Sequence, residues 1–418
     1  MNHFFAPGAL VAYYEDNSGH EDTTDIRQQR VSYDSSQVQQ FGGTSDNVHT
    51  YASAFNNQMG TPHVNPTFRL MHIKDQVVAF CADANGSRFI QQAIEVATIE
   101  EIVMVYEEIT PYVCMLSIDV FGNHAIQKIL NHGPQLYKRI FINHLMGHVF
   151  GLSLHMYGCR VIQKVFDVAE QDQRLEMAKE LSSKVLICVC DKFANYVIQK
   201  CMECLPSKNI EFIFQSLRGK VAALSTHAYG WHVVKKMLAY SSHSPEIHHM
   251  VTAEIIESAK VLSADQYGNY VVQHLLEHGS PIKRSMMVTE FVGRIVTMSY
   301  NKHASNVIDK CLTFGCDRDR QVITNEIIST GGAEHFDDLI MVGVLDMMIH
   351  PYASLVIQKM VETAEEQKIC MLLGVAWSKS NMDNLKRNQH GRHVIAAMEK
   401  FIAAKGKHAS LLCPCHHL

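Results

Sequence analysis

The stretch Gly268-Asn269-Tyr270-Val271-Val272-Gln273 decides the fold, because variants of this hexad recur along most of the chain. The variants are GSRFIQ (86–91), GNHAIQ (122–127), GCRVIQ (158–163), ANYVIQ (194–199), GWHVVK (230–235), ASNVID (304–309) and ASLVIQ (353–358). A ninth copy, GRHVIA (391–396), lacks the final polar residue. The last position advances by 36 residues four times from Gln91 to Lys235, and then by 38, 36, 49 and 38. This spacing indicates a repeat architecture, in which each unit buries its apolar face only against its neighbours.

Each hexad is preceded by a residue suited to starting a helix. Three positions before the first hexad residue stand Asp83, Asp119, His155, Asp191, His227, Asp265, Asn301, His350 and Asn388. Most of these side chains are good helix N-caps, so a helix is predicted to begin just ahead of each hexad. Another helix-compatible apolar segment lies about twenty residues upstream, for example at 102–106 or 175–185. Two helices per repeat is therefore the simplest interpretation of the periodicity.

The hexad itself has two faces when it is helical. Positions two, three and six fall within one narrow arc, whereas positions four and five point the opposite way. In the quoted stretch these are Asn269, Tyr270 and Gln273 on one side and Val271 and Val272 on the other. Each repeat is predicted to bury the aliphatic pair and to expose a front face, with two polar side chains and a planar or cationic one between them.

The ends of the chain differ from the repeats. Residues 1–65 are rich in Ser, Gln, Asn, Gly and Asp and are predicted to form a disordered, acidic tail. Its apolar run FFAPGALVAYY (4–14) contains Pro-Gly, lacks a basic flank and is too short to span a bilayer, so no membrane or secretory route is indicated. A short partner-binding motif is the alternative there. Residues 66–405 are predicted to form one elongated repeat domain, and 406–418 a C-terminal tail.

The net charge of −5 belongs to the tail. Of 37 Lys and Arg residues two lie in 1–65, and of 42 Asp and Glu residues seven do, which leaves 35 of each sign in the rest of the chain. Attraction of phosphates would therefore require cations gathered on the front face. The candidates are Arg88, Arg160 and Lys235 within hexads and Lys128, Lys164, Lys200 and Lys236 directly after them.

The cysteine spacing does not predict a metal site, and the sequence contains none of the common catalytic motifs. Cys188, Cys190, Cys201 and Cys204 come closest to a zinc pattern, but the last two follow a helical run, and structural zinc needs four converging ligands. The run 413–417 (CPCHH) is predicted to be a frayed tail. No metal site is predicted, and scattered thiols fit a reducing, cytoplasmic compartment. The chain has no Walker loop, G-x-S-x-G, H-E-x-x-H or dinucleotide fingerprint, so neither enzymatic activity nor a cofactor is predicted.

The composition of the front face suits a splayed nucleobase. Tyr, His and Arg offer flat surfaces for stacking, while Asn and Gln offer both a donor and an acceptor to a base edge. The alternative is that the polar residues only keep the surface soluble and the planar ones pack against neighbours. Gln stands at the last position in six of eight hexads, which favours base recognition.

These hexads resemble those of the Pumilio/FBF (PUF) family of RNA-binding proteins, over about residues 66–405. The resemblance implies an all-α, right-handed α-solenoid, a crescent of eight three-helix repeats followed by a C-terminal pseudo-repeat. RNA would run antiparallel along its inner face, so that the last repeat meets the 5′ base. The family's code pairs Asn and Gln with uracil, Cys or Ser and Gln with adenine, and Ser and Glu with guanine.

The code assigns candidate RNA-binding residues to each repeat. Uracil would be read by Asn123, His124 and Gln127, by Asn195, Tyr196 and Gln199, and by Asn269, Tyr270 and Gln273. Adenine would be read by Ser87, Arg88 and Gln91, and by Cys159, Arg160 and Gln163. The atypical repeats are five, with Trp231, His232 and Lys235, seven, with Ser305, Asn306 and Asp309, and eight, with Ser354, Leu355 and Gln358. From its 5′ end the implied target is N-G-U-N-U-A-U-A, and a 5′ UGU core is the family's habit.

The atypical repeats leave parts of the code open. Asp309 stands where the family usually has Glu, and its carboxylate can accept from guanine but is one methylene shorter. His232 could stack, but Lys235 has no acceptor, so this base is either unspecified or a purine contacted through O6 or N7. Leu355 is not aromatic, which leaves the first base of the target open.

One insertion interrupts the period. The step of 49 residues between Asp309 and Gln358 exceeds the usual 36 by 13, and STGGA (329–333) marks a loop within it. In the family the corresponding region contacts regulatory proteins. Gly331–Phe336 is therefore predicted to dock such a partner.

The resemblance implies a cytoplasmic, non-enzymatic protein, expected to be monomeric, that binds UGU-containing single-stranded elements in mRNA 3′ untranslated regions. It would repress translation or promote deadenylation through recruited proteins. Two alternatives remain open. One is an armadillo-like scaffold that binds peptides, and the other is a Pumilio-like nucleolar protein that binds structured RNA, although proteins of that kind tend to have degraded hexads and a more basic surface.

Overall fold

Every element in the described part of the chain is a helix. The computed structural model describes residues 68–240, 244–329 and 339–405. The predicted tail 1–65, the predicted docking segment Gly331–Phe336 and the C-terminal segment 406–418 with its Cys and His run lie outside these residues. Among the described helices none is long and apolar enough to cross a membrane. The all-α class expected from the hexads is confirmed.

Three helices form each repeat: a first helix, a hexad helix and a third helix, in that order, and the first helix is short except in repeat eight, where it has 11 residues. In repeat three these are α10 (Val149–Ser153), α11 (Gly158–Val168) and α12 (Gln171–Ser182). The three-helix repeat implied by the family resemblance is confirmed, and the interpretation of two helices per repeat is wrong. In repeats four and six the short helix is hidden in the sequence because it follows the preceding long helix almost at once. For example, α13 (Val185–Cys190) begins three residues after α12, with neither Pro nor Gly between them.

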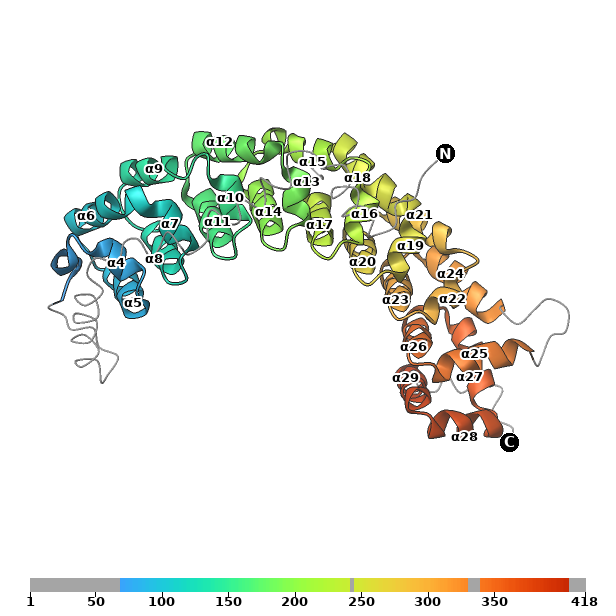
Figure 1. The fold of residues 1–418 in the computed structure, drawn as a ribbon. Coiled ribbons are helices and arrows are strands. Elements are labelled where there is room, and N and C mark those ends of the chain that lie inside the picture. Colours follow the sequence, from blue (N-terminus) through green and yellow to red (C-terminus); the bar gives the residue numbers. More distant parts are fainter. Residues whose placement is uncertain (1–67, 241–243, 330–338, 406–418) are drawn as a thin grey trace, which may run out of the picture. The chain divides into compact units, whose positions relative to one another are not determined.

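The chain divides into two compact units, and the first ends at Arg218. Its other helices are η2 (Leu70–Ile73), α4 (Val77–Cys81), α5 (Ala84–Ala93), α6 (Ile99–Ile109), η3 (Thr110–Tyr112), α7 (Val113–Ile118), α8 (Gly122–Ile129), α9 (Gln135–Asn143), α14 (Ala194–Cys204), η4 (Ser207–Asn209) and α15 (Glu211–Leu217). The hexad helices α5, α8, α11 and α14 pack each against the next. Figure 1 shows them in a row on one side of this unit, with the long helices α6, α9 and α12 on the opposite side.

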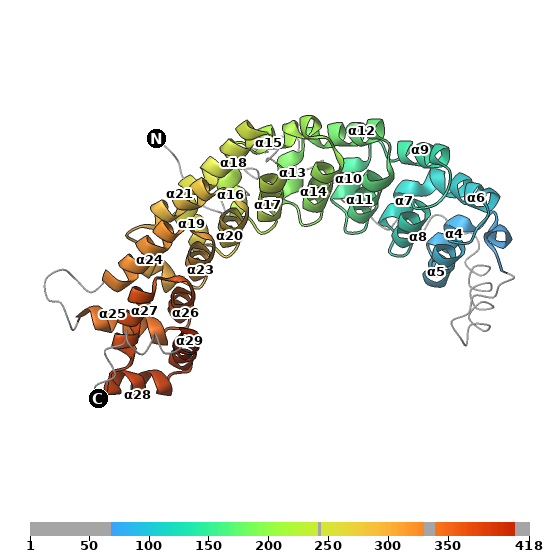
Figure 2. The same cartoon turned by 180° about the vertical axis from the view of Figure 1, so that it is seen from behind.

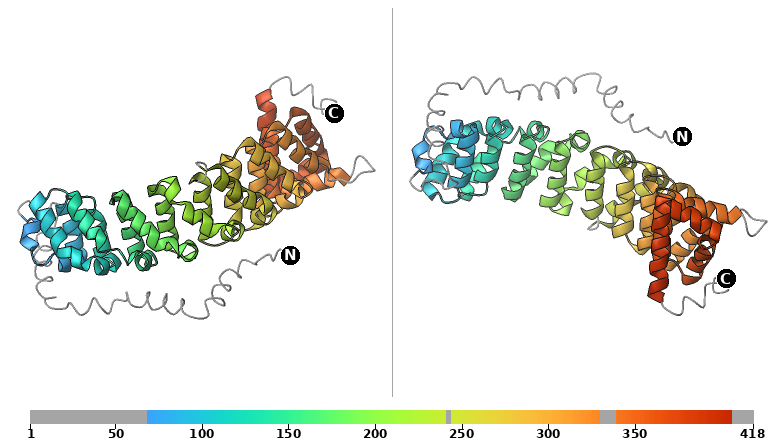
Figure 3. Two further views of the ribbon diagram at one scale, coloured as in Figure 1. Left: turned by 90° about the horizontal axis from the view of Figure 1, so that it is seen from above. Right: turned by 90° about the horizontal axis from the view of Figure 1, so that it is seen from below.

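The second unit begins at Gly219 and is built in the same way. Its helices are α16 (Val221–Ser225), α17 (Gly230–Tyr240), α18 (Pro245–Glu257), α19 (Ala259–Ala264), α20 (Gly268–His278), α21 (Pro281–Phe291), α22 (Ile295–Ser299), α23 (Ala304–Phe314), α24 (Asp317–Ser329), α25 (Leu339–Ile349), α26 (Ala353–Thr363), α27 (Glu366–Ala376), α28 (Lys379–Arg387) and α29 (Gln389–Lys405). The hexad helices α17, α20, α23, α26 and α29 pack in sequence (Figure 2). Within each unit the repeats follow one another in a single layered array (Figure 3). The ninth hexad lies on α29 and continues the stack.

The aliphatic pair of each hexad forms the core between the hexad helices and the short helices. Val271 and Val272 are fully buried, and the equivalent pairs in the other seven repeats are at most 1% exposed. Each such side chain contributes about 1.5–3 kcal/mol relative to an exposed one. The small first residue is required by close packing, since a Cβ on Gly268 would lie 2.7 Å from the carbonyl oxygen of Leu262.

The residues predicted as N-caps all bind amides at the start of their hexad helices, although the helix begins directly after Asp83 and Asn388 and three residues after the other seven. In repeat six Asp265 Oδ1 accepts hydrogen bonds from the amides of Tyr267 (2.8 Å) and Gly268 (2.7 Å). The same pair of bonds recurs at the other eight positions. Where the cap is histidine, the acceptor is Nδ1. Burial lowers the pKa of His155 and His227, so these rings stay neutral near pH 7 and Nδ1 can accept.

In odd-numbered repeats a glutamate of the long helix binds the start of the short helix. Glu254 accepts from the amides of Gly219 (2.8 Å) and Val221 (2.9 Å). The equivalent residues Glu108, Glu180 and Glu326 each bind two amides in repeats one, three and seven. In every case one of the two amides belongs to a residue with positive φ, namely Asp75, Gly147, Gly219 or Gly293. We call this arrangement the glutamate clamp.

Even-numbered repeats begin differently. In repeats two, four and six the long helix of the preceding repeat runs almost directly into the short one; for example, α18 ends at Glu257 and α19 begins at Ala259. The position of the clamp glutamate is occupied by His144, Ser216 and Glu290 in repeats two, four and six. Glu290 instead forms an ion pair with Lys260 of α19 (3.4 Å). Two successive repeats are therefore not equivalent on the side away from the hexads.

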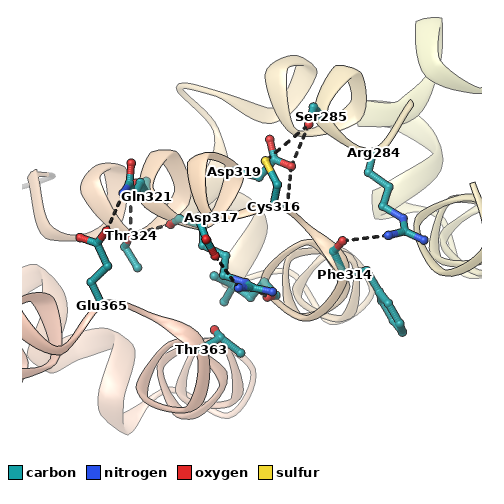
Figure 4. Close-up of polar contacts among 12 residues, drawn as sticks. Arg284, Ser285, Phe314, Cys316, Asp317, Asp319, Gln321, Thr324, Thr363 and Glu365 are labelled. Atoms are coloured by element: carbon teal, nitrogen blue, oxygen red, sulfur yellow. Dashed lines mark hydrogen bonds and ion pairs between the residues drawn. The ribbon is translucent and has the colours of Figure 1, made fainter. Parts of the chain in front are cut away.

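Polar contacts also join the long helices to the ends of the hexad helices (Figure 4). Arg284 of α21 donates to the carbonyls of Glu277 and Phe314, both at 3.1 Å, which lie at the ends of α20 and α23. Ser285 donates to the buried carboxylate of Asp319 in α24 (2.9 Å). Carbonyls at helix C-termini have no partner within their own helix, so these bonds fix where each hexad helix ends relative to the next.

Candidate nucleic-acid interface

The three front-face side chains of each hexad lie at different depths. Position three is exposed in seven repeats, with Tyr196 and Tyr270 about half exposed, and position six is half-buried in all eight. Position two is at most 4% exposed in the seven repeats where it is Asn, Ser or Cys. The prediction that both polar side chains of the front face are exposed is therefore wrong for position two. That side chain lies beneath the surface, against the turn that precedes the helix.

The buried asparagines are held by backbone carbonyls. Asn269 Nδ2 donates to the carbonyls of Asp265 (2.8 Å) and Gln266 (3.0 Å), and its Oδ1 accepts from Gln273 Nε2 (2.8 Å). The same three bonds recur at Asn123 and Asn195. The asparagine thus fixes the glutamine, whose Oε1 and second amide hydrogen remain to meet a ligand.

Serine and cysteine at position two make fewer bonds. Ser87 Oγ donates to the carbonyl of Phe121 (2.9 Å) and accepts from Gln91 Nε2 (3.1 Å). Cys159 Sγ contacts the carbonyl of Met156 (3.5 Å), so Gln163 turns to the carbonyl of Cys159 instead (3.0 Å). In repeat eight the buried Ser354 Oγ has no hydrogen-bond partner. In both kinds of repeat the glutamine Nε2 donates to a group at position two, to the asparagine side chain in repeats four and six, to the Ser87 hydroxyl in repeat one and to the Cys159 carbonyl in repeat three.

Repeat seven forms a cleft around its carboxylate. A cleft of about 300 Å³ is lined by Ser305, Asn306, Asp309, Leu355, Gln358, Lys359 and Glu362. Burial raises the pKa of Asp309, although Lys359 and Lys310 favour its ionised form. The cleft places side chains of repeats seven and eight around one acceptor, and Asn306 and Leu355 lie exposed at its rim.

Repeat five has a different arrangement. The ring of Trp231 stacks on His232, with centroids 3.8 Å apart, and on Tyr270 of repeat six at 5.2 Å. Lys235 Nζ lies 5.6 Å from the centroid of the Trp231 ring. His232 and Lys235 therefore both lie against the indole, and Trp231 is half-buried where Asn269 of repeat six is buried.

Several of the lysines expected to attract phosphate are paired with carboxylates. Lys128 pairs with Glu95, and Lys200 with Asp167 (3.2 Å) and Glu203 (2.8 Å). Lys310 and Glu277 repeat this pattern, in which the lysine after a hexad meets the tenth residue counted from the start of the preceding hexad. The hydrogen bond from Lys310 lowers the pKa of Glu277. These partners were missed by the sequence analysis, although an acidic residue four positions after the hexad was the available signal.

Other candidate cations lie in different surroundings. Lys236 Nζ lies 5.6 Å from the centroid of the Tyr240 ring. Arg88 and Arg160 are exposed at position three of their hexads. The positive charge available on the hexad face is therefore smaller than the count of basic residues indicates.

The described cysteines do not gather into a metal site. Cys188 and Cys201 are buried, and burial raises the pKa of both thiols. In the described ranges the one group of three or more possible metal ligands is His274, Glu277 and His278 on α20. Glu277 is already bound to Lys310, so this group is an ion-paired cluster in the present structure.

The eight hexad repeats match the sequence model of a known protein family. A sequence model described as the Pumilio-family RNA binding repeat matches residues 76–110, 112–146, 148–182, 185–218, 220–255, 261–291, 294–328 and 343–374. Each segment contains one of the eight hexads, and together the segments cover more than half of the chain.

Similar proteins occur in a yeast and in a plant. A Pumilio domain-containing protein of Schizosaccharomyces pombe is 27% identical over 325 residues, which make up 78% of this chain and 46% of that protein. The putative pumilio homolog 8, chloroplastic, of Arabidopsis thaliana is 31% identical over 294 residues, or 69% of this chain and 54% of that protein. The chain spans about half the length of these relatives.

Two similar solved structures contain RNA. The crystal structure of PUF-8 in complex with PBE-RNA aligns with a TM-score of 0.73 and 26% identity, over 83% of this chain and 99% of that one. The Puf3 RNA-binding domain bound to a Cox17 RNA 3′ UTR recognition sequence aligns with a TM-score of 0.69 and 33% identity, over 81% and 96%. Nearly the whole of each RNA-bound domain therefore has a counterpart here.

Proposed function

Because the chain belongs to the Pumilio family of RNA-binding repeat proteins, we propose that its hexad faces bind single-stranded RNA and read one base per repeat. The observation that supports this most strongly is the fixed geometry of the Asn–Gln pairs. In repeats two, four and six a buried asparagine holds a half-buried glutamine beside an exposed His or Tyr. A base stacked on that ring would meet the free edge of the glutamine amide.

The proposed target follows from the side chains of each repeat. Repeats two, four and six select uracil, and repeats one and three select adenine, where Ser87 and Cys159 replace the buried asparagine beside the glutamine. Repeat seven selects guanine, because the Asp309 carboxylate can accept from both N1–H and N2–H. The target read from its 5′ end is N-G-U-N-U-A-U-A, with UGU at the 5′ end as the preferred core.

The proposed role is regulation of messenger RNA without catalysis. The Puf3 domain, similar over most of this chain, is bound to a 3′ UTR recognition sequence, and this motivates the proposal that 3′ untranslated regions are the targets here. Repression of translation or deadenylation would then require recruited proteins, with Gly331–Phe336 as the proposed docking segment. A cytoplasmic monomer is the proposed state of the protein.

Fluorescence anisotropy with the full-length protein tests RNA binding directly. Labelled RNAs of eight or nine nucleotides that contain UGU are compared with ACA controls at about 150 mM salt, because phosphate contacts depend on ionic strength. We expect the UGU sequences to bind with much higher affinity. Substituting Asn269, Tyr270 and Gln273 together should remove this preference, while circular dichroism shows that the helices remain.

Two results would contradict the proposal. Weak binding that does not depend on sequence would favour a protein that binds structured RNA. No binding, or binding unchanged by the triple substitution, would favour a scaffold that recognises peptides through the same surface.

A further inference from the structure

Repeat five differs from the other repeats in the residue at hexad position two. That position is at most 4% exposed when it holds Asn, Ser or Cys. In repeat six the space is filled by the carboxamide of Asn269, which is bonded to the carbonyls of Asp265 and Gln266. The Trp231 indole is much larger than this carboxamide and has one hydrogen-bond donor where the carboxamide has two. Its ring therefore cannot enter the same buried space.

The ring of Trp231 lies instead against the planar side chains of two repeats. Its plane is inclined by 29° to that of His232 and by 28° to that of Tyr270, with centroids 3.8 and 5.2 Å away. Offset stacking at such distances is favourable between aromatic rings. Lys235 Nζ, 5.6 Å from the indole centroid, adds a cation–π contact.

These contacts occupy the surfaces that a base would use. Under the proposed function a base stacks on the position-three side chains, which are His232 in repeat five and Tyr270 in repeat six. Trp231 is stacked on one face of each of these rings, so a base of repeat five finds no room to stack there, while the second face of Tyr270 remains for the base of repeat six. The position-six residue cannot replace the missing stack with hydrogen bonds as glutamine does, because the Lys235 ammonium has no acceptor.

We propose that Trp231 takes the place of a nucleobase in repeat five, so that the RNA passes this repeat with one nucleotide that is not read. The fourth nucleotide of the target then acts as a spacer whose base points away from the protein, while its phosphate can be attracted by Lys235. This inference rests on the proposed function and adds to it the identity of the residue that sets the spacing between the UGU core and the downstream bases.

An abasic nucleotide in the RNA separates a spacer from a base that is bound. The full-length protein is titrated with labelled U-G-U-N-U-A-U-A RNAs that carry an abasic site at the third or at the fourth position. Loss of the third base should lower the affinity about 5- to 150-fold, the range expected for one lost base–aromatic stack. Loss of the fourth base should change the affinity by less than about twofold, which corresponds to a small fraction of one such stack.

A double variant should enable repeat five to recognise the fourth base. Trp231→Asn with Lys235→Gln recreates the Asn269 and Gln273 pair beside the planar His232. We expect uracil at the fourth position to become preferred by about tenfold, in the range of one good bidentate contact. An abasic site there should become as costly as at the third position. Lys235→Gln alone is the matched control and should gain neither property, because Trp231 still covers the stacking surface.

Tryptophan fluorescence gives a readout that does not depend on affinity. The chain has two tryptophans, and Trp377 lies after α27, away from the hexad residues. In a Trp377→Phe background, which should bind RNA as the unsubstituted protein does, the emission comes from Trp231 alone. RNA with a base at the fourth position and RNA with an abasic site there should give the same emission.

The outcomes distinguish the inference from the function on which it rests. Equal losses of affinity at the third and fourth positions, together with quenching of Trp231 only when the fourth base is present, would show that Trp231 stacks on a base. That result overturns the inference and leaves sequence-specific RNA binding intact. Absence of any preference for UGU over ACA would overturn both.

Discussion

Repeats five and six have the same sequence of helices, the same N-cap bonds and the same buried aliphatic pair, yet their front faces differ completely. In repeat six Asn269 is buried, Gln273 is fixed by it, and Tyr270 is half exposed. In repeat five Trp231 stands at the hexad position of the asparagine. Its ring stacks on His232 and lies beneath the ammonium of Lys235. One residue at position two therefore decides whether a repeat presents a base-sized surface.

The comparison shows where the specificity of a repeat is set. The outward residues at positions three and six would contact a ligand, but position two determines their geometry from below. Its pocket is made by carbonyls of the preceding turn, such as those of Asp265 and Gln266, which are present whatever the sequence. A residue that fits the pocket organises the face, and one that does not fit it covers the face.

Transferring the tryptophan to repeat six should have the largest effect. In Asn269→Trp the indole cannot enter the pocket and Gln273 loses its anchor. We expect the selection of uracil at the third position to disappear and the affinity to fall about 5- to 150-fold. Anisotropy with RNAs that vary at this position measures both. Asn269→Ser, which fits the pocket, is the control, and comparable losses in both variants would contradict the role of side-chain size.

Repeat seven extends the comparison to a carboxylate reader. Burial raises the pKa of Asp309 above that of an ordinary Asp. The carboxylate is ionised, and able to accept from guanine, above this pKa, and it becomes protonated as the pH falls through it. The preference for guanine over adenine at the second position should therefore weaken as the pH is lowered from about 7 toward the usual range of Asp, about 4.

The control for this pH dependence is Asp309→Asn. This variant should show a weaker guanine preference that does not change over the same pH range, because the amide does not titrate there. A preference in the unsubstituted protein that stays constant while the helical circular dichroism also stays constant would contradict the assignment of Asp309.

The two repeats also differ behind the face, and stability measurements can sharpen that difference. Glu254→Gln in repeat five removes a charged acceptor from the amides of Gly219 and Val221, and should lower the free energy of unfolding by about 1–2 kcal/mol. Glu290→Gln at the equivalent position of repeat six breaks only a half-exposed ion pair and should cost less than about 0.5 kcal/mol. Urea denaturation of both variants tests this, and equal costs would mean that the clamp does not hold the turn.

The smallest expected effect concerns the lysine that follows the hexad. Glu277→Gln removes the partner of Lys310 and should leave the stability within about 0.5 kcal/mol. The released ammonium should raise RNA affinity slightly at low ionic strength, and the gain should vanish as salt is added. Anisotropy at two salt concentrations measures it. A gain that is independent of salt would argue against charge release.

Much of the fold follows from local rules that the sequence shows directly. The N-cap residues, the aliphatic pair and the small first residue each act within a few residues of the hexad, so the hexad helices could be predicted with their faces. The short helix of repeat four could not, because neither Pro nor Gly lies between Ser182 and Val185, whereas Gly147, Gly219 and Gly293 were an available signal ahead of repeats three, five and seven. The clamp glutamates act across a whole repeat, and only an alignment of alternate repeats would have shown them.

The sequence predicts which hexad positions share one side of the helix, but not how deeply each side chain lies. Helical geometry puts positions two, three and six on one side, as the structure shows. Burial of position two depends on backbone carbonyls outside the helix, and pairing of Lys128 with Glu95 depends on how adjacent repeats stack. The position of the Trp231 ring depends on Tyr270 in the next repeat. Each of these requires coordinates of two neighbouring elements.

The glutamate clamp divides the array into pairs. Clamp residues occur at Glu108, Glu180, Glu254 and Glu326, at intervals of 72, 74 and 72 residues, which is two hexad periods each time. Removing a single repeat would place two clamped or two unclamped repeats next to each other, whereas removing two would preserve the alternation. The modular unit for lengthening or shortening this protein, whether by recombination of its gene or by engineering new RNA readers, is therefore a tandem of two repeats.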